Sequence, residues 1–535
     1  MRVEQCEVVL LATSDLHGFI CPRSYATRDE VGHGLARVAN IVKEQRQLHA
    51  HTLLIDNGDA LQGTPLTYYH ARVNAEPANP VVACMNELRY DAAVLGNHEF
   101  NYGLPYLRSA VEASGFPWLS ANIREAATGA PLFGKPYLVR ELDNGVRIGV
   151  LGLTTSYIPN WEQPQHIEGI LFDDPVETAR HWVDVMKREE RVDVVVVSYH
   201  GGFERDVETG VPTEPLTGEN VGYALCQQVE GINVLLTGHQ HRTIESCHIN
   251  GVCVVQPANE GRYLGKVTLE LEQGESGWSV ASSRSALIDA ADYGADERME
   301  LIADEVETLT QTWLDQPIGF VDGNMTIAAH ADVRLREHPL IEFINRVQMD
   351  VSGARISNTA LFDNLSPGFG SRITMRDIVS NYIYPNTLKV IRISGRDIRS
   401  ALEKSAEYFA LDAQGKIVVS DAFLLPKPQH YNYDMWEGID YVLDIAQPIG
   451  QRVVKLELNG QPLAEDEPFD VVMNNYRAGG GGNFAMFQDK PVVKDIATDM
   501  VELLADYIRE RGRITAGANG NWRVVNGRTS SIDAR

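Results

Sequence analysis

Short apolar runs separated by longer helical patterns fill the first 290 or so residues and constrain the fold more than any other feature. The runs cover residues 8–13, 52–56, 92–95, 147–153, 192–198 and 233–237. Runs of this length that are rich in Val, Ile and Leu are typical of buried strands, and their alternation with helices favours a layered α/β domain. Each run ends in polar or glycine-rich residues. Because ligand-binding loops gather at the carboxyl ends of strands in such layers, we expect a binding site there.

Five of these strand ends carry side chains that can bind metal. They are Asp15 with His17, Asp59, Asn97 with His98, His200, and His239 with His241. Carboxylate, imidazole and amide oxygen suit divalent ions such as Mn, Fe or Zn, and a carboxylate can bridge two of them. A single histidine or aspartate at a strand end is more often a hydrogen-bonded or turn-forming residue. Five such clusters in series instead favour a dinuclear metal centre.

In order along the chain, the clusters read DLH, GD, GNHE, H and GHQH, and they resemble the motifs of the calcineurin-like metallophosphoesterases. The resemblance implies a four-layer αββα sandwich over residues 1–295. It also implies that Asp15, His17 and His241 hold one ion, that Asn97, His200 and His239 hold a second, and that Asp59 bridges them. His98 would bind no metal and would stabilise the transition state or protonate the leaving group.

The chemistry implied by this resemblance is hydrolysis of phosphoric esters with two divalent ions, Mn, Zn or Fe, as cofactors. A pair of ions polarises the phosphoryl oxygen and generates a metal-bound hydroxide near neutral pH, which attacks phosphorus. Imidazole suits proton transfer near pH 7, which fits the role of His98.

The pattern changes after about residue 295. Residues 297–315 have helical periodicity and contain no glycine or proline, so we expect a helix within a linker over residues 296–325. Residues 326–535 mix predicted helices (340–347, 395–408 and 495–511) with predicted strands (388–393, 441–445 and 453–458). This mixture predicts a C-terminal α+β domain.

The whole chain resembles the bacterial 5′-nucleotidase and 2′,3′-cyclic-nucleotide 2′-phosphodiesterase/3′-nucleotidase family, whose C-terminal domain holds the nucleoside. In 5′-nucleotidases an aspartate that pairs with the catalytic histidine follows the GNHE motif, whereas Asn101 stands here. The arginine that grips phosphate in that branch is also missing from residues 356–362. Residues 384–388, 431–438 and 474–479 instead resemble the cyclic phosphodiesterase branch.

We therefore expect a 2′,3′-cyclic-nucleotide 2′-phosphodiesterase and 3′-nucleotidase. A 5′-nucleotidase, or a nucleotide-sugar or dinucleotide hydrolase with the same centre, is the near alternative. A non-catalytic nucleotide-binding sensor is an alternative of another class, and loss of a metal ligand or of His98 would be its expected mark. The sequence has lost neither.

The same resemblance places a nucleoside site in the second domain. It implies that Tyr433 and Tyr476 hold the base between them, and such stacking contributes about 1–3 kcal/mol per base. Without the resemblance, packing in the core would be the preferred interpretation of these aromatic residues. Tyr431 is the fallback for Tyr433. Asn475 and Gly479 complete the predicted site, since glycine allows the backbone to approach a ligand closely, although a flexible loop is the alternative.

Charge and composition limit the kinds of partner that we expect the chain to bind. The chain has 47 basic and 73 acidic residues, a net charge of −26, which disfavours duplex nucleic acid but leaves open a small nucleotide held by metal. No apolar run reaches the roughly 18 residues of a membrane span, and no signal peptide is apparent. The six cysteines lack CxxC spacing, which favours reduced thiols and a cytoplasmic location, although related proteins are often exported. The oligomeric state stays open.

Overall fold

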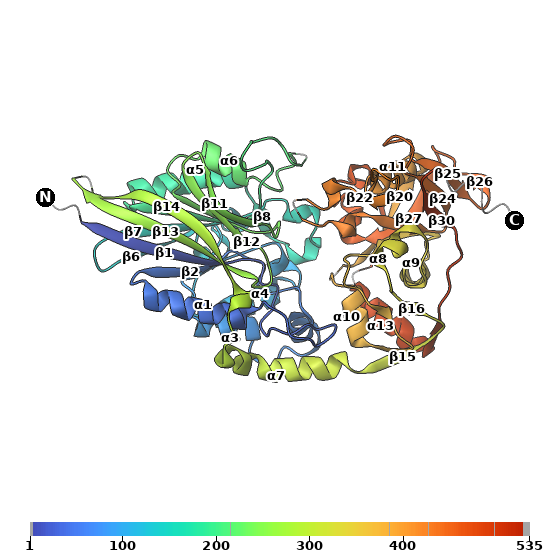
Figure 1. Cartoon of the computed structure of the whole chain (residues 1–535), viewed down its shortest axis with the longest axis horizontal. Coiled ribbons are helices and arrows are strands. Elements are labelled where there is room, and N and C mark those ends of the chain that lie inside the picture. Colours follow the sequence, from blue (N-terminus) through green and yellow to red (C-terminus); the bar gives the residue numbers. More distant parts are fainter. Residues whose placement is uncertain are drawn as a thin grey trace. The chain divides into compact units, whose positions relative to one another are not determined.

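The computed structural model describes residues 4–214, 216–275, 277–384, 386–425, 427–496 and 498–527. The chain divides into two compact units, Met1–Thr310 and Gln311–Arg535. The division falls within helix α7 (Glu297–Leu314), which occupies the segment where a linker helix was expected (Figure 1).

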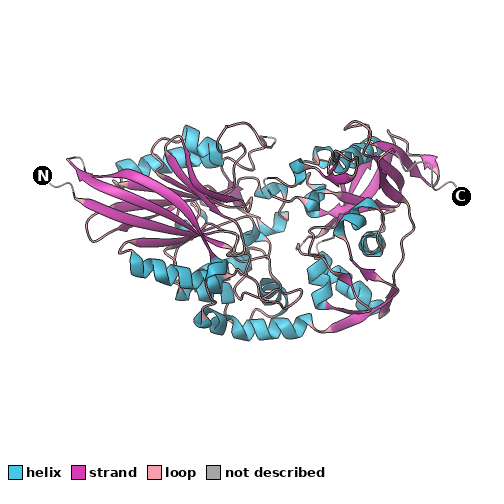
Figure 2. Ribbon diagram, viewed as in Figure 1, coloured by secondary structure: helices cyan, strands magenta, loops and turns pink. Residues whose placement is uncertain are grey.

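The first unit is built around two six-stranded sheets (Figure 2). One sheet has the order β14-β13-β1-β2-β3-β4, with bounds Gly277–Asp289, Tyr263–Gly274, Gln5–Thr13, Thr52–Asp56, Ala92–Val94 and Trp118–Leu119. The other has the order β11-β12-β10-β9-β7-β6, with bounds Thr243–Ile249, Val252–Pro257, Val234–Thr237, Val194–His200, Arg147–Thr154 and Tyr137–Glu141. The apolar runs singled out in the sequence form the central strands of both sheets.

Strand β9 shows how the layers form. Successive side chains of a strand point to opposite faces, so Val194 and Val196 join a core cluster that includes residues of both sheets. Val195 and Val197 point the other way and pack with α5 (Pro175–Arg188) and α6 (Gly222–Gln228). On the other sheet, α1 (Leu35–Leu48) contacts β2 and β13. Two facing sheets with helices outside confirm the predicted α/β sandwich.

Strand direction positions the site. β1, β2 and β3 run parallel to one another, as do β7, β9 and β10. The carboxyl ends of neighbouring strands therefore lie at the same edge of each sheet, and the predicted ligands follow these ends. The first unit also contains three shorter helices, α2 (Pro65–Tyr68), α3 (Pro80–Glu87) and α4 (Leu104–Ala113).

The second unit contains a five-stranded sheet of order β23-β17-β27-β20-β28 and a four-stranded sheet of order β26-β25-β24-β30. In these orders, the strands of the five-stranded sheet have the bounds Asp434–Glu437, Ile356–Ala360, Pro468–Asn474, Leu388–Ser394 and Val492–Ile496. Those of the four-stranded sheet have the bounds Gln461–Pro462, Val453–Leu458, Asp440–Asp444 and Trp522–Val525. The main helices are α9 (Pro339–Ser352), α10 (Met375–Asn381), α11 (Gly395–Ala406) and α13 (Met500–Arg511). A three-stranded sheet joins β15 (Pro317–Asp322), β19 (Arg372–Thr374) and β29 (Arg513–Thr515).

The helix predicted over residues 495–511 begins later than expected. Asp495 and Ile496 belong to β28, which pairs antiparallel with β20, and the helix begins at Met500. Asp499 precedes it with an extended backbone, as is usual for a residue that caps a helix N-terminus. Pairing with a neighbouring strand outweighs helical propensity at this boundary.

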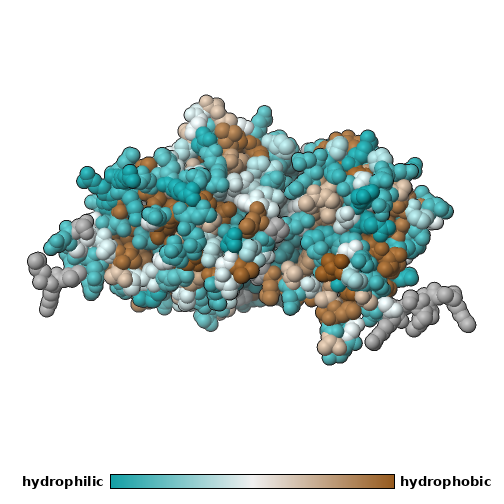
Figure 3. Space-filling view, turned by 90° about the horizontal axis from the view of Figure 1, so that it is seen from above, coloured by the Kyte–Doolittle hydropathy of each residue, from teal (hydrophilic) through white to brown (hydrophobic). Residues whose placement is uncertain are grey.

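Figure 3 shows a surface that is mostly hydrophilic on the face drawn, with hydrophobic residues in smaller groups. Among the described residues, none of the helices has the length and the apolar character needed to cross a membrane.

Candidate active site

The seven predicted metal ligands converge at the carboxyl ends of β1, β2, β3, β9 and β10. Asp15, His17 and His241 form one group and Asp59, His200 and His239 another, with the donor atoms of each group within 4.8 Å of one another. The distances include 3.1 Å between His17 Nε2 and His241 Nε2, 3.3 Å between Asp15 Oδ1 and His241 Nε2, and 3.1 Å between Asp59 Oδ2 and His200 Nε2. Asn97 Oδ1 lies 3.2 Å from His200 Nε2 and 2.9 Å from His239 Nδ1.

The backbone at these positions is unusual. Five of the seven have positive φ: Asp15 (53°), His17 (49°), Asp59 (57°), His239 (64°) and His241 (54°). Residues other than glycine rarely adopt this left-handed conformation, and such strain gathers at functional sites because the surrounding fold enforces it. The turns that follow three strands therefore bend to direct side chains toward one place.

Two glycines let the ligand loops approach one another. A Cβ on Gly96, just before Asn97, would overlap the Asp59 carboxylate, and one on Gly238 would overlap Ser14 and Asp15. Glycine has no side chain, so it leaves the space that these neighbouring atoms occupy. The glycines of the GNHE and GHQH motifs thus have a packing reason.

The hydrogen bonds of three histidines indicate which ring nitrogen faces the cluster. His200 Nδ1 donates to the Asn57 carbonyl and His17 Nδ1 to the Gln62 carbonyl, both at 2.8 Å. His239 Nε2 lies 3.1 Å from a Glu219 oxygen and donates to it. The opposite nitrogen of each ring faces other acceptor atoms. Such acceptors gather stably around cations, and outer acceptors that hold ligand histidines are usual at metal sites, so these residues fit a divalent metal centre.

Electrostatics supports the same assignment. Burial disfavours charge on both Asp59 and His200, but their mutual attraction outweighs it, lowering the pKa of Asp59 and raising that of His200 to about 10, so a proton on His200 Nε2 occupies the place that a bound cation would take. Burial, together with the charges of His241 and His98, lowers the pKa of His17 to about 4. His17 is thus neutral near pH 7 and keeps a lone pair for a cation.

Glu99 is a positioning residue that sequence reasoning did not single out. Its buried carboxylate accepts hydrogen bonds from the backbone N–H groups of Asp59, Ala60, Leu61 and Gly96, at 2.6–3.1 Å. It thereby joins the loop after β2 to the loop after β3. Its place within GNHE was the available signal.

Glu219 and Trp161 were also missed. Glu219 accepts the hydrogen bond from His239 described above. The Trp161 ring stacks on the His239 ring, with centroids 5.4 Å apart and an interplanar angle of 27°. Both residues lie in loops without a recognisable motif, so the sequence alone offered no signal for them.

His98 lies beside the ligands. Its Nδ1 is 2.6 Å from Asn101 Oδ1, and its Nε2 is 4.0 Å from Asp59 Oδ2. Asn101 thus occupies the position of the partner expected from the resemblance, as an amide in place of a carboxylate.

Comparisons with known proteins agree with this arrangement. The profile of the calcineurin-like phosphoesterases matches residues 8–243, and that of the 5′-nucleotidase C-terminal domain matches residues 317–489. A Staphylococcus aureus protein that carries a 5′-nucleotidase name, solved in complex with α-ketoglutarate, is 36% identical, with a TM-score of 0.88 over 97% of this chain and 100% of its own. This chain belongs to the 5′-nucleotidase family.

Two curated relatives of the 5′-nucleotidase family are 28% identical to the chain. One is the 2′,3′-cyclic-nucleotide 2′-phosphodiesterase/3′-nucleotidase of Yersinia enterocolitica, aligned over 96% of this chain and 88% of its own length. The other is the trifunctional nucleotide phosphoesterase YfkN of Bacillus subtilis, aligned over 97% of this chain. The chain spans 39% of the length of YfkN. The family membership makes the protein a phosphoester hydrolase, and the calcineurin-like enzymes use a dinuclear centre of divalent ions.

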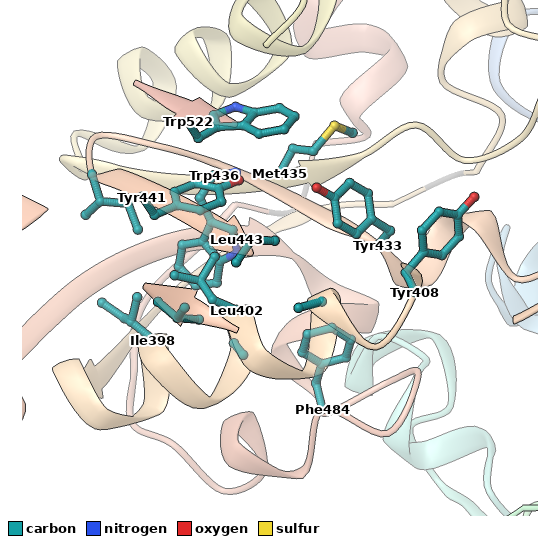
Figure 4. Close-up of a cluster of buried hydrophobic side chains, with 14 of the residues drawn as sticks. Ile398, Leu402, Tyr408, Tyr433, Met435, Trp436, Tyr441, Leu443, Phe484 and Trp522 are labelled. Atoms are coloured by element: carbon teal, nitrogen blue, oxygen red, sulfur yellow. Dashed lines mark hydrogen bonds between the residues drawn. The ribbon is translucent and has the colours of Figure 1, made fainter. Parts of the chain in front are cut away.

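The predicted role of Tyr433 is wrong. Its side chain is fully buried in the core of the second unit, where its ring stacks on Tyr408 with centroids 5.1 Å apart (Figure 4). The ring centroids of Tyr433 and Phe409 are 4.9 Å apart in an edge-to-face arrangement. A ring with no exposed surface offers no face to a base. Packing in the core, the interpretation preferred without the resemblance, is therefore correct for Tyr433. Tyr431, the fallback, is partly exposed.

The other predicted nucleoside-site residues lie together at one end of β27. Asn475 and Tyr476 begin the short helix α12 (Asn475–Ala478), Gly479 follows it, and all three are partly exposed. The Asn475 side chain accepts a hydrogen bond from the Thr387 backbone at 3.0 Å, so it also fixes a neighbouring loop. A Cβ on Gly481 would lie 2.6 Å from the Tyr476 ring, so this glycine allows the loop to pass close to that ring.

Proposed function

We propose that the chain hydrolyses 2′,3′-cyclic nucleotides to 3′-nucleotides and then 3′-nucleotides to nucleosides. The pairing of His98 with Asn101, in place of an aspartate, is the observation that carries this choice. The 28% identity to a Yersinia enterocolitica enzyme with that name supports it.

In the proposed reaction, Asp15, His17 and His241 hold one divalent ion and Asn97, His200 and His239 a second, with Asp59 between them. The ions, when bound, neutralise charge on the phosphate and activate water. The water oxygen bonds to phosphorus as the bond from phosphorus to the 2′-oxygen breaks. His98 gives a proton to the departing oxygen, since its Nε2 faces the ligand cluster while Nδ1 is held by Asn101.

The base is proposed to stack on Tyr476, with Tyr431 as the second ring. Buried Arg477 donates to the Tyr431 carbonyl at 2.9 Å and to the Gly481 carbonyl, and so holds the segment that carries Tyr431 to the glycine loop. An ion pair of 2.8 Å with Asp434 fixes the Arg477 guanidinium itself. Stacking tolerates different bases, so we expect little preference among them.

A 5′-nucleotidase is the second candidate. The 36% identity to the Staphylococcus aureus protein with that name favours it. The two candidates share the metal centre and differ in which ester oxygen leaves.

A substrate panel separates them. Protein loaded with Mn or Zn is assayed with 2′,3′-cyclic AMP, 3′-AMP and 5′-AMP, and His98→Ala with full metal content is the control. We expect turnover of the first two substrates and a loss of about 10²–10⁴-fold in kcat for His98→Ala. Phosphate release from 5′-AMP alone would establish the second candidate instead. Tight nucleotide binding without turnover of any substrate would indicate a sensor.

A further inference from the structure

A chain of hydrogen bonds continues beyond the contact between His98 and Asn101. Asn101 Nδ2 donates to Glu162 Oε2 at 2.6 Å. The other Glu162 oxygen, Oε1, accepts from the Gln163 backbone at 2.7 Å and from His166 Nδ1 at 2.8 Å. Glu162 is 9% exposed and lies between the short helices η4 (Ile158–Asn160) and η5 (Pro164–His166). The buried carboxylate of Glu162 is thus linked to His98 through the Asn101 side chain.

The donor and acceptor atoms of these groups fix the direction of the hydrogen bonds from His98 to Glu162. A carboxylate has only acceptor atoms, so the end of the Asn101 amide that faces Glu162 is the NH₂ group. The amide oxygen must then face His98, and because that oxygen can only accept, the proton of His98 lies on Nδ1. Nε2 is left for exchange with the substrate on the side of Asp59.

We infer that Glu162 is a positioning residue: through Asn101 it keeps one proton of His98 on Nδ1, so that Nε2 is the atom that takes up a second proton and passes it to the leaving oxygen. This role rests on the proposed function for its catalytic meaning. The tautomer itself rests only on the hydrogen bonds. A partner that selects the wrong tautomer of a catalytic histidine lowers kcat while leaving the geometry intact.

Glu162→Gln should reverse the direction of the hydrogen bonds that link residue 162, Asn101 and His98. A glutamine has one acceptor oxygen, and it satisfies two donors if it faces Gln163 and His166, so its NH₂ group faces Asn101. The Asn101 amide then flips, its NH₂ group faces His98 Nδ1, and the one proton of His98 moves to Nε2. Because giving up this proton would leave an imidazolate, and Nδ1 no longer has an acceptor for a second proton, the ring becomes a much weaker acid. We expect kcat to fall about 10–100-fold with KM changed less than about twofold. Glu168→Gln, an exposed residue of the same segment with the same loss of charge, is the matched control and should leave kcat unchanged.

A double variant tests direction separately from structure. In Asn101→Asp with Glu162→Gln, the new carboxylate accepts from both His98 Nδ1 and the new amide, so we expect kcat to recover at least half of its loss. Asn101→Asp alone places two carboxylates in contact and should stay impaired. Loss of activity by mere disruption would be worse in the double variant than in either single one, and that result would overturn the inference.

Nitrogen NMR of the ring reads the tautomer without substrate or turnover. Protein with ¹⁵N-labelled histidine carries 15 such rings, and the His98 signals are those that disappear in His98→Ala. We expect an Nδ1–H tautomer in the native protein and Nε2–H in Glu162→Gln. An unchanged tautomer in a folded Glu162→Gln protein would overturn the inference. If that variant does not fold, Asn101→Ala serves instead, and native kcat there would overturn it as well. A switch in tautomer in a protein that hydrolyses none of the nucleotides would refute the proposed function and leave the positioning role standing.

Discussion

Single residues outside the ligand set orient the ligand histidines. The acceptors of His17 and His200 are backbone carbonyls, which no substitution removes, whereas that of His239 is the carboxylate of Glu219. Glu219 is therefore the one of these three contacts that mutation can test without altering a ligand.

Glu219→Gln should weaken metal binding about tenfold while leaving the fold intact. The amide still reaches His239 but holds its tautomer less strongly than a charged acceptor does. Titration of the chelated protein with Mn or Zn, followed by calorimetry, measures the change. Glu208→Gln, on an exposed stretch of the same loop region, supplies the comparison. Equal affinity of both variants would show that the contact has no influence on binding.

Tyr433→Phe separates core packing from base binding. Among the described residues, the Tyr433 hydroxyl has no hydrogen-bond partner although it is buried. Its removal should leave the free energy of unfolding within about 1 kcal/mol, and KM for nucleotides should not change. Tyr476→Ala should raise KM by about tenfold, because a stacking ring is lost. A rise in KM for Tyr433→Phe would restore Tyr433 to the nucleoside site. Urea unfolding and steady-state kinetics provide the two measurements.

The sequence located the candidate ligands because each follows a strand and belongs to a motif with glycines at fixed places. It failed at Tyr433 because Tyr431 and Tyr433, two positions apart, look alike in a sequence, whereas their exposure depends on how α11 and β23 pack around them. Glu162 and Glu219 left no local pattern, since their partners lie 61 and 20 residues away.

At the scale of elements, the loops after β2 and β3 form one structural body. Glu99 joins them by accepting hydrogen bonds from four of their backbone N–H groups. The apolar runs predicted the strands themselves well, because buried strands need continuous hydrophobic side chains. The helix start at Met500 was misplaced, since strand pairing of β28 is not visible in local propensity.

Glu99→Gln should destabilise the first unit by about 2–4 kcal/mol. The amide presents an NH₂ group to backbone donors and leaves some of them buried without an acceptor. Urea unfolding followed by tryptophan fluorescence measures the loss, and metal content after dialysis should fall with it. An unfolding midpoint equal to that of the native protein would contradict a joining role for Glu99. Glu125→Gln, on a partly exposed strand of the same unit, provides a reference.

At the scale of the whole molecule, the seven candidate ligands lie between Asp15 and His241, within one of the two units. The predicted aromatic contacts to the base lie in the other unit. In the proposed function, metal and base are therefore recognised by different compact units of the chain.

Metal should therefore stabilise one unit selectively. Calorimetry of the full chain should show two unfolding transitions, and chelation should lower the temperature of only one. Ligand binding at 1,000 times Kd contributes about 4 kcal/mol to the unit that binds it. Proteolysis at intermediate temperature identifies which unit has unfolded. Equal shifts of both transitions would contradict this division.

The carboxylate of Glu99 also bears on how the enzyme acquires its ions. Its bonds join protein groups to protein groups, so the ligand loops keep their shape while one ion is exchanged for another. The ligand types do not separate these metals, so we expect occupancy among Mn, Zn and Fe to follow their supply. Preparations from media of different metal content should then differ in bound metal and in specific activity.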